Sequence, residues 1–233
     1  MRGIALLSGM ALVLAGSAGA YEATDVKDGG TITGVVKFEG TPPAPKKIEV
    51  TKDQQVCGKE KEAEDLIVKD GKIENAIVSI SDIQKGKKLE TKEVKLDQKG
   101  CHYEPHVLMF PAGSTIKILN SDGILHNIHT YSKVNPPMNV AQPKFKKEIT
   151  AKLDKPETVP VKCDAHGWMS GVFVVQEHPY YAQTDGSGSF KLTDVPPGEY
   201  TLKVWHETLG EKTEKVKVES GKEANVEFTL AAK

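Results

Sequence analysis

The feature that most constrains the fold is a succession of short β-branched and aromatic runs, separated by turns rich in glycine and proline. Beyond residue 20, no segment carries apolar residues at the spacing of about 3.6 residues that an amphipathic helix requires. Many short runs with turns between them are typical of an all-β sandwich or barrel. The sequence therefore predicts strands over residues 31–38, 76–80, 107–110, 115–119, 159–162, 172–175, 200–205, 215–218 and 225–230.

The first twenty residues have the pattern of an export signal. Arg2 precedes an apolar run over residues 4–15, and the small residues Ala18-Gly19-Ala20 follow it. This order is typical of a cleaved secretory signal peptide over residues 1–20. The apolar run is shorter than the roughly 20 residues that a membrane span needs. We therefore expect a mature chain that starts at Tyr21, is periplasmic or secreted, and has no membrane span.

The charge balance argues against a nucleic-acid partner. The chain has 31 Lys and Arg against 32 Asp and Glu, which gives a net charge of −1. Proteins that bind nucleic acid normally have a basic excess or a basic patch.

The charged stretch over residues 52–65 fits either a short helix or a loop.

One short segment gathers three soft metal-binding side chains. It reads Cys163-Asp-Ala-His166-Gly-Trp-Met169 and lies between two predicted strands. A cysteine, two histidines and a weakly bound methionine describe a blue-copper site. A single short loop cannot surround an ion, so a second imidazole must come from elsewhere. His126 follows the predicted strand 115–119 and is the candidate.

These residues belong to a longer pattern that resembles the cupredoxins, the family of plastocyanin, azurin and amicyanin. The pattern comprises Tyr103-x-Pro105, Pro111-Ala-Gly-x-Thr115, Asn120-x-Asp122, His126-Asn127 and Cys163-x2-His166-x2-Met169-x-Gly171-x-Phe173-x-Val175. The short spacing between Cys163 and Met169 is similar to that of amicyanin. The resemblance covers residues 92–178 and implies a Greek-key β-sandwich, which we place at residues 91–181.

The resemblance implies a role for each matching residue. His126, Cys163 and His166 would be the equatorial ligands of one copper ion that cycles between Cu(I) and Cu(II), and Met169 would be the axial ligand. Asn127 would tie the two ligand loops together, and His166, at the solvent end of its loop, would be the exit route for the electron. Trp168 is among the apolar neighbours that would keep water away.

Several alternatives remain open at the site. Met169 is also an adaptable core residue, and Cys163 could instead form a disulfide. His129 lies three positions after His126, which on a strand places the two on opposite faces. A role at the surface or in support of the ligands is therefore favoured over a ligand role. His106 starts a predicted strand and is a further residue that could lie near the metal.

Cys57 and Cys101 are the other two cysteines of the chain. They have no metal-like spacing with each other, and export favours disulfides. With Cys163 assigned to copper, we expect a disulfide between Cys57 and Cys101. Closing a loop of this length would stabilise the fold by about 3–4 kcal/mol in the loop-entropy model.

The C-terminal part of the chain resembles a second family. Thr184-Asp-Gly-Ser-Gly-Ser-Phe190-x-Leu192 and Pro197-Gly198-x-Tyr200-Thr-Leu-x-Val204 are similar to the carboxypeptidase regulatory-like domain, a transthyretin-like β-sandwich. The front part, Ile32-Thr-Gly34-x-Val36 and Asn75-Ala76-x-Val78, resembles the opening strands of the same domain. We therefore expect residues 28–90 and 182–233 to be two halves of one sandwich that the cupredoxin interrupts. Three consecutive pieces are a simpler alternative.

Together these resemblances imply an exported mononuclear type 1 copper protein that carries single electrons. Its partner would be a redox protein such as a c-type cytochrome or a periplasmic dehydrogenase. The alternative is a copper-binding protein for storage, delivery or sensing. We do not expect an enzyme, because the chain has neither the His-x-His pairs of a multicopper oxidase nor a Gly-x-Ser-x-Gly nucleophile elbow.

Overall fold

A computed structural model describes residues 20–232 of the chain. Of the predicted signal peptide, residues 1–20, all but Ala20 lies outside this range. The described chain is built almost entirely of strands, with one short helix, α1 (Gln54–Cys57), and this confirms the predicted all-β class. Within the described range, no helix has the length and apolar character needed to span a membrane.

One β-sandwich contains strands from both ends of the chain and is called the terminal sandwich. Its strands are β2 (Gly30–Phe38), β5 (Val68–Lys69), β6 (Lys72–Ile73), β7 (Ile77–Ile80), β18 (Tyr181–Gln183), β19 (Ser189–Val195), β20 (Gly198–His206), β21 (Gly210–Val218) and β22 (Glu223–Leu230). One sheet has the order β18-β7-β20-β21. The other has the order β19-β2-β6-β5, with β22 paired in parallel to β2.

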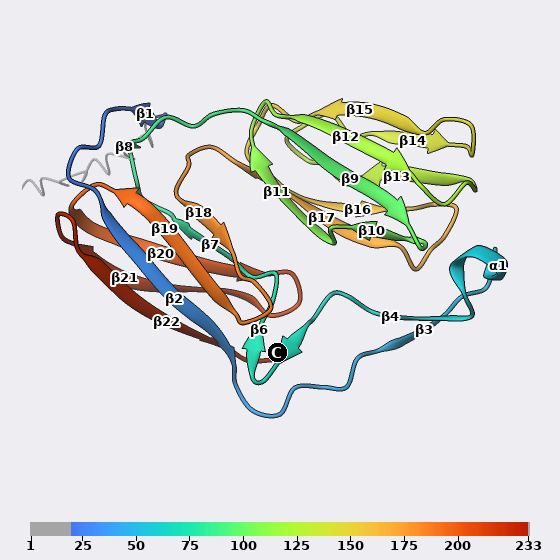
Figure 1. The fold of residues 1–233 in the computed structure, drawn as a ribbon, viewed down its shortest axis with the longest axis horizontal. Helices are drawn as coiled ribbons and strands as arrows, with labels where there is room; N and C mark the ends of the chain where they lie inside the picture. Colours follow the sequence, from blue (N-terminus) through green and yellow to red (C-terminus); the bar gives the residue numbers. More distant parts are fainter. Residues whose placement is uncertain (1–19, 233) are drawn as a thin grey trace, which may run out of the picture.

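A second sandwich, called the central sandwich, is formed by the middle of the chain. Its strands are β9 (Glu93–Lys99), β10 (His102–Glu104), β11 (Val107–Pro111), β12 (Thr115–Asn120), β13 (His126–Thr130), β14 (Asn139–Gln142), β15 (Glu148–Lys152), β16 (Glu157–Lys162) and β17 (Ser170–Gln176). The two sheets have the orders β10-β9-β12-β15 and β11-β17-β16-β13-β14. Figure 1 shows the two sandwiches side by side.

Each sandwich has its own apolar core because its strands alternate buried and exposed residues. Strand β2 buries every second residue along its full length, as a strand with one face on a core should. The core of the terminal sandwich includes Ile32, Leu202 and Phe228. The core of the central sandwich includes Phe110 and Ile118. Burying a large apolar side chain contributes about 1.5–3 kcal/mol, so both cores are substantial.

A small third cluster joins the two sandwiches. Ile77 of β7 lies in one cluster with Val107, Val172 and Val174 of β11 and β17, and Trp205 of β20 packs against it. The sandwiches therefore share an apolar contact in addition to the connecting chain. Strands β1 (Glu22–Ala23) and β8 (Lys85–Gly86) pair separately, outside both sandwiches.

The segment between β2 and β5 leaves the terminal sandwich and lies along the central one. Strands β3 (Lys47–Glu49) and β4 (Glu60–Glu62) pair in antiparallel fashion, and α1 lies at their tip. The charged stretch 52–65, which the sequence left undecided, therefore contains a short helix and a short strand. We call residues 47–62 the strap. Figure 1 shows that it reaches the end of the central sandwich at which β9 and β10 meet.

Candidate metal centre

Two loops at one end of the central sandwich bring the sequence-predicted ligands together. After β12, the loop over residues 121–125 leads to His126 at the start of β13. After β16, Cys163 opens a loop that ends at Met169, just before β17. The backbone N–H of Cys163 donates to the carbonyl of Met169 (3.2 Å), and that of Met169 donates to the carbonyl of His166 (2.9 Å). These bonds close the loop into a compact turn.

His126, Cys163 and His166 form a group that could hold a metal ion. Their ligand atoms all lie within 4.8 Å of one another, and all three residues are buried. Nδ1 of His126 lies 3.0 Å from Nδ1 of His166, which lies 3.8 Å from the sulfur of Cys163. A single ion about 2.0 Å from nitrogen and about 2.3 Å from sulfur spans separations of this size.

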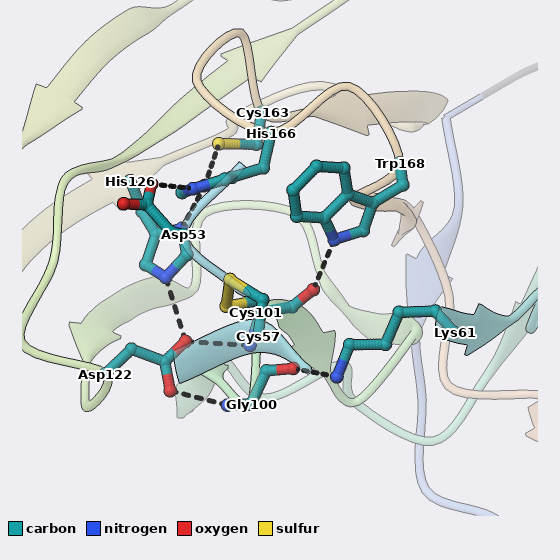
Figure 2. Close-up of a disulfide and its surroundings, with 10 residues drawn as sticks. All are labelled: Asp53, Cys57, Lys61, Gly100, Cys101, Asp122, His126, Cys163, His166 and Trp168. Atoms are coloured by element: carbon teal, nitrogen blue, oxygen red, sulfur yellow. Dashed lines mark hydrogen bonds and ion pairs between the residues drawn. A yellow bond between two sulfur atoms is a disulfide. The ribbon is translucent and has the colours of Figure 1, made fainter. Parts of the chain in front are cut away.

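A carboxylate binds the outer nitrogen of each imidazole, as Figure 2 shows. Nε2 of His126 lies 2.8 Å from Asp122, and Nε2 of His166 lies 2.8 Å from Asp53. A carboxylate only accepts hydrogen bonds, so both Nε2 atoms carry the proton. In a neutral ring, Nδ1 then presents its lone pair to the shared space beside the sulfur.

This arrangement fits a cation in the space between the three side chains. Two lone pairs of neutral imidazoles repel each other at 3.0 Å unless a positive charge lies between them. Burial lowers the pKa of His126, which favours the neutral ring that a metal requires. Thiolate and imidazole donors together suit copper and zinc better than magnesium or calcium.

Burial also determines the state of the thiol. Desolvation raises the pKa of Cys163, while hydrogen bonds from backbone N–H groups, that of His166 foremost, act in the opposite direction. Without a cation, the thiol is therefore neutral at physiological pH. A metal ion supplies the positive charge that converts such a buried thiol into a thiolate ligand.

Asn127 and Trp168 lie beside the ligands. Oδ1 of Asn127 accepts a hydrogen bond from the backbone N–H of Asp164 (2.7 Å), which links the β13 end to the Cys163 loop. The hydroxyl of Tyr103 donates to the backbone carbonyl of Asn127 (2.7 Å) and so holds the backbone of this residue in place. The indole of Trp168 packs against the ring of His166, with 5.0 Å between centroids.

The other residues that the sequence singled out, Met169, His129 and His106, lie outside the group of His126, Cys163 and His166. Met169 is buried in the core of the central sandwich, directly after the ligand loop. His129 turns away from the ligands, pairs with Asp164 (2.9 Å) and stacks on Tyr131. His106 is hydrogen-bonded to Glu207 of the terminal sandwich and is outside the ligand group.

One expectation about His166 is corrected by the structure. The family resemblance implied that His166 lies at the solvent end of its loop, whereas its side chain is 0% exposed. Its role as the exit route for the electron stays a prediction. The cause is the strap, which the cupredoxin pattern does not contain. It places Asp53 over the outer edge of the ring.

The two carboxylates are the candidate functional residues that the sequence did not point to. Asp122 lies four residues before His126, inside the Asn120-x-Asp122 motif, so its short spacing could have pointed to it. Asp53 lies 113 residues from His166, and no local pattern connects the two.

The expected disulfide between Cys57 and Cys101 is present, and Cys163 is the free cysteine. The sulfur of Cys101 lies within 4.8 Å of ligand atoms of Asp122 and His126. Because this sulfur is bonded to Cys57, it offers no thiolate. Within the described residues, the group with three free donor atoms that could hold a metal ion is therefore His126, Cys163 and His166.

Comparisons with known proteins identify one domain family and one group of folds. Residues 169–231 match the family model of the carboxypeptidase regulatory-like domain. We expected the C-terminal half of the interrupted sandwich to start at residue 182, and the match begins before that residue. The match does not include the strands of the terminal sandwich that come from the front part of the chain. No curated protein matches the chain in sequence.

The solved structures similar to this chain include cupredoxins. A reduced Cu(I) form of an amicyanin variant is 22% identical over 36% of this chain and 82% of its own, with a TM-score of 0.33. A purple cupredoxin from Nitrosopumilus maritimus is 18% identical over 36% of this chain and 99% of its own (TM-score 0.31). A copper-containing nitrite reductase from Thermus scotoductus is 25% identical over 40% of this chain and 24% of its own (TM-score 0.33). These are partial similarities, so the function is inferred from the site itself.

Proposed function

We propose that this chain is an exported mononuclear type 1 copper protein that carries single electrons between redox proteins. The observation that supports it is the buried group of one thiol and two imidazoles whose Nδ1 atoms face each other at 3.0 Å. When bound, copper in such a site supplies a centre that cycles between Cu(I) and Cu(II). Met169, at the end of the ligand loop, is the proposed axial ligand.

The protein's own residues hold this donor set in place. Asp122 and Asp53 hold the outer edges of the two imidazoles, and Asn127 links the two ligand loops. Because three buried side chains are held by hydrogen bonds from separate segments, little rearrangement is needed between the two oxidation states. Burial keeps water from the ligands. These are the properties that an electron carrier needs, and none of them requires a bound substrate.

The domain organisation is part of the proposal. We propose that residues 28–90 and 182–233 make one carboxypeptidase regulatory-like sandwich, and that residues 91–181 interrupt it as the copper-binding unit. The pairing of β2 with β19 and β22 supports this reading, as does the pairing of β7 with β18 and β20. The interrupted sandwich would then serve as a scaffold, in a periplasmic or secreted protein whose partner is another redox protein.

The covered edge of His166 favours a second candidate function, that of a protein that stores or delivers copper. A ligand that is 0% exposed offers no direct contact to an electron acceptor. Voltammetry of the copper-loaded chain separates the two functions. A reversible couple supports the electron carrier, and a site that releases copper on each reduction supports storage or delivery.

Titration with Cu(II) tests the metal centre. We expect one copper per chain and an intense visible band from thiolate-to-copper charge transfer. Cys163→Ser should abolish the band, and His126→Ala should abolish or strongly weaken it. His129→Ala is the matched control, because His129 lies on the same strand outside the ligand group, and it should leave the band unchanged. A band that persists in Cys163→Ser would contradict the proposal.

A further inference from the structure

The strap is attached to the central sandwich although it belongs to the N-terminal part of the chain. Its residues Val50 and Cys57 are buried in the core of the central sandwich. Lys61 donates a hydrogen bond from Nζ to the carbonyl of Gly100. The disulfide between Cys57 and Cys101 adds a covalent link. The strap is thus held at three points around the end of the sandwich where the ligands lie.

Asp53 is the strap residue that reaches the ligands. It lies just before α1 in the left-handed backbone region, with φ of 52°. Aspartate tolerates this conformation better than most residues. Its carboxylate accepts a hydrogen bond from Nε2 of His166 (2.8 Å) and closes off the outer edge of the ring. Figure 2 shows Asp53 on the opposite side of the His166 ring from Trp168.

The disulfide is linked to both histidines through Cys101. The backbone N–H of Cys101 donates to Asp122 (2.8 Å), the carboxylate that holds His126. The carbonyl of Cys101 accepts from the indole N–H of Trp168 (3.2 Å), which packs against His166. Cys57, on the other side of the disulfide, ends the helix that Asp53 precedes.

The two outer carboxylates therefore differ in how they are fixed. Asp122 is held within the central sandwich by the backbone N–H groups of Gly100 and Cys101. Asp53 comes from a separate segment, and its position depends on the attachment of the strap. A carboxylate on the outer nitrogen fixes the tautomer and orientation of a metal-binding imidazole and raises its basicity. Without Asp53, the ring of His166 loses that partner and gains a path to water.

We propose that the strap is a third component of the metal centre, in which Asp53 positions His166 and the Cys57–Cys101 disulfide keeps Asp53 in place. This inference rests on the proposed copper site and extends it to residues outside the cupredoxin pattern. Metal retention then depends on an N-terminal segment of the chain, and the strap controls whether the His166 edge is open to water and to a partner.

Substitution of Asp53 in the full-length chain tests the positioning role. Asp53→Ala should weaken the affinity for Zn(II), used as a redox-inert probe, and for Cu(II) by about 10- to 100-fold. It should also speed the transfer of copper to a chelator and shift the reduction potential. Asp53→Asn should recover part of the affinity, because an amide oxygen still accepts from Nε2. Glu49→Gln, an exposed carboxylate on β3, is the matched control and should behave as wild type.

A measurement on the metal-free chain separates this inference from the proposed function. Diethyl pyrocarbonate should modify His166 slowly in the wild type and at least about tenfold faster in Asp53→Ala, because the ring loses its cover. If the wild type binds neither metal, the proposed function is wrong. If it binds copper, but Asp53→Ala matches it in affinity, release rate and modification rate, the positioning role is overturned.

The disulfide requires a double variant. Cys57→Ser alone would leave the sulfur of Cys101 free within 4.8 Å of ligand atoms of His126 and Asp122, where it could compete for metal. The double variant Cys57→Ser, Cys101→Ser should release copper faster than wild type, as Asp53→Ala should. Wild-type release and modification rates in a folded double variant would show that the disulfide does not hold Asp53, and would overturn that part of the proposal.

Discussion

The two sandwiches use the same architecture but differ in what they bury. Outside the ligand group, the central sandwich has several fully or nearly buried polar side chains, which are Gln98, His106, Ser114, Asn120, Asn127, Thr130, Asn135 and Gln142. The buried polar side chains in the terminal sandwich and its edges are fewer, namely His178, Thr184 and His206. In the described residues, the buried side-chain polar atoms without a hydrogen-bond partner all belong to positions 97–132, which lie in the central sandwich.

This difference shows which sandwich loses folding free energy to buried polar groups. Leaving a buried polar group without a partner costs about 1–3 kcal/mol. The terminal sandwich avoids most of that cost with an apolar core. In the central sandwich, part of the polar set supports the ligand loop, because Asn120 donates to the carbonyls of Ile124 (2.8 Å) and Gln142 (2.9 Å). Gln98 in turn donates to the side chain of Gln142 (2.7 Å). Part of the polar burial thus lies near the proposed metal centre, whereas Asn135, which is hydrogen-bonded to Glu157, lies at the other end of the sandwich.

Matched core truncations test whether the two sandwiches are separate units. Phe110 and Phe228 are each 0% exposed, one in each core. Phe110→Ala and Phe228→Ala should each lower the free energy of unfolding by about 3–5 kcal/mol. Phe110→Ala should also weaken copper binding, whereas Phe228→Ala should leave the copper spectrum unchanged. Calorimetry with and without copper, together with the optical titration, measures both effects.

A single cooperative transition in both variants would contradict this separation. So would the loss of the copper band in Phe228→Ala under conditions in which the chain is folded. Either result would mean that the apolar contact around Ile77 and Val172 couples the two cores into one unit.

A second prediction concerns the end of the central sandwich that lies away from the ligands. Glu157 accepts hydrogen bonds from the backbone N–H groups of Lys133, Val134 and Asn135 and from the side chain of Asn135. Desolvation raises the pKa of Glu157, but these hydrogen bonds outweigh it and lower the pKa to about 2. Glu157→Gln should lower the free energy of unfolding at neutral pH by about 1–2 kcal/mol and leave the copper spectrum unchanged.

The pH dependence of this effect follows from the sign of the shift. A carboxylate with a lowered pKa contributes its stability above the unfolded value of 4.5, and loses it as the pH falls toward about 2. The difference between wild type and Glu157→Gln in urea unfolding should therefore shrink between about pH 5 and pH 3. A constant difference, or a change in the copper band, would show that Glu157 acts in another way. Glu199→Gln, an exposed position on β20, serves as the control.

The all-β class could be read from the sequence because alternation and turn residues are local signals. Strands such as 31–38 and 200–205 carry β-branched and aromatic residues in a clear pattern, and the structure has β2 and β20 at these places. Strand β15 (Glu148–Lys152) was not predicted. None of its residues is buried, since they alternate between partly and fully exposed positions, so the strand lacks the clear alternation of apolar and polar residues that would reveal it. Its pairing with β12, rather than its own composition, determines that it is a strand.

The ligand group could be predicted for a related reason, whereas its surroundings could not. Cys163 and His166 lie close together in sequence, and His126 follows a recognisable strand after a short loop. The cover over His166 depends on a contact between positions 53 and 166, which depends on the path of the strap and on the disulfide. No periodicity or motif encodes such a contact. This explains why the burial of His166 was not predicted while its place beside Cys163 was foreseen.

The smallest predicted effect concerns the pair that joins the two sandwiches, His106 and Glu207. Burial lowers the pKa of His106, but the hydrogen bond and charge of Glu207, together with the charge of Glu64, outweigh it and raise the pKa above its usual value. His206 also lies near His106, and its pKa is lowered by burial. A raised histidine pKa contributes stability that is complete below the unfolded value of 6.5 and is lost as the pH rises through the folded value.

Glu207→Gln isolates this contribution from the other histidines, which also titrate in this range. The variant should be less stable than wild type by about 1 kcal/mol at pH values near 6, and the difference should shrink toward pH 8–9. Urea unfolding at several pH values measures it, with Glu211→Gln on the neighbouring strand as the control. A difference that does not change with pH would mean that Glu207 acts only as a neutral hydrogen-bond acceptor. The contact between the sandwiches would then depend on the apolar cluster around Ile77 rather than on charge.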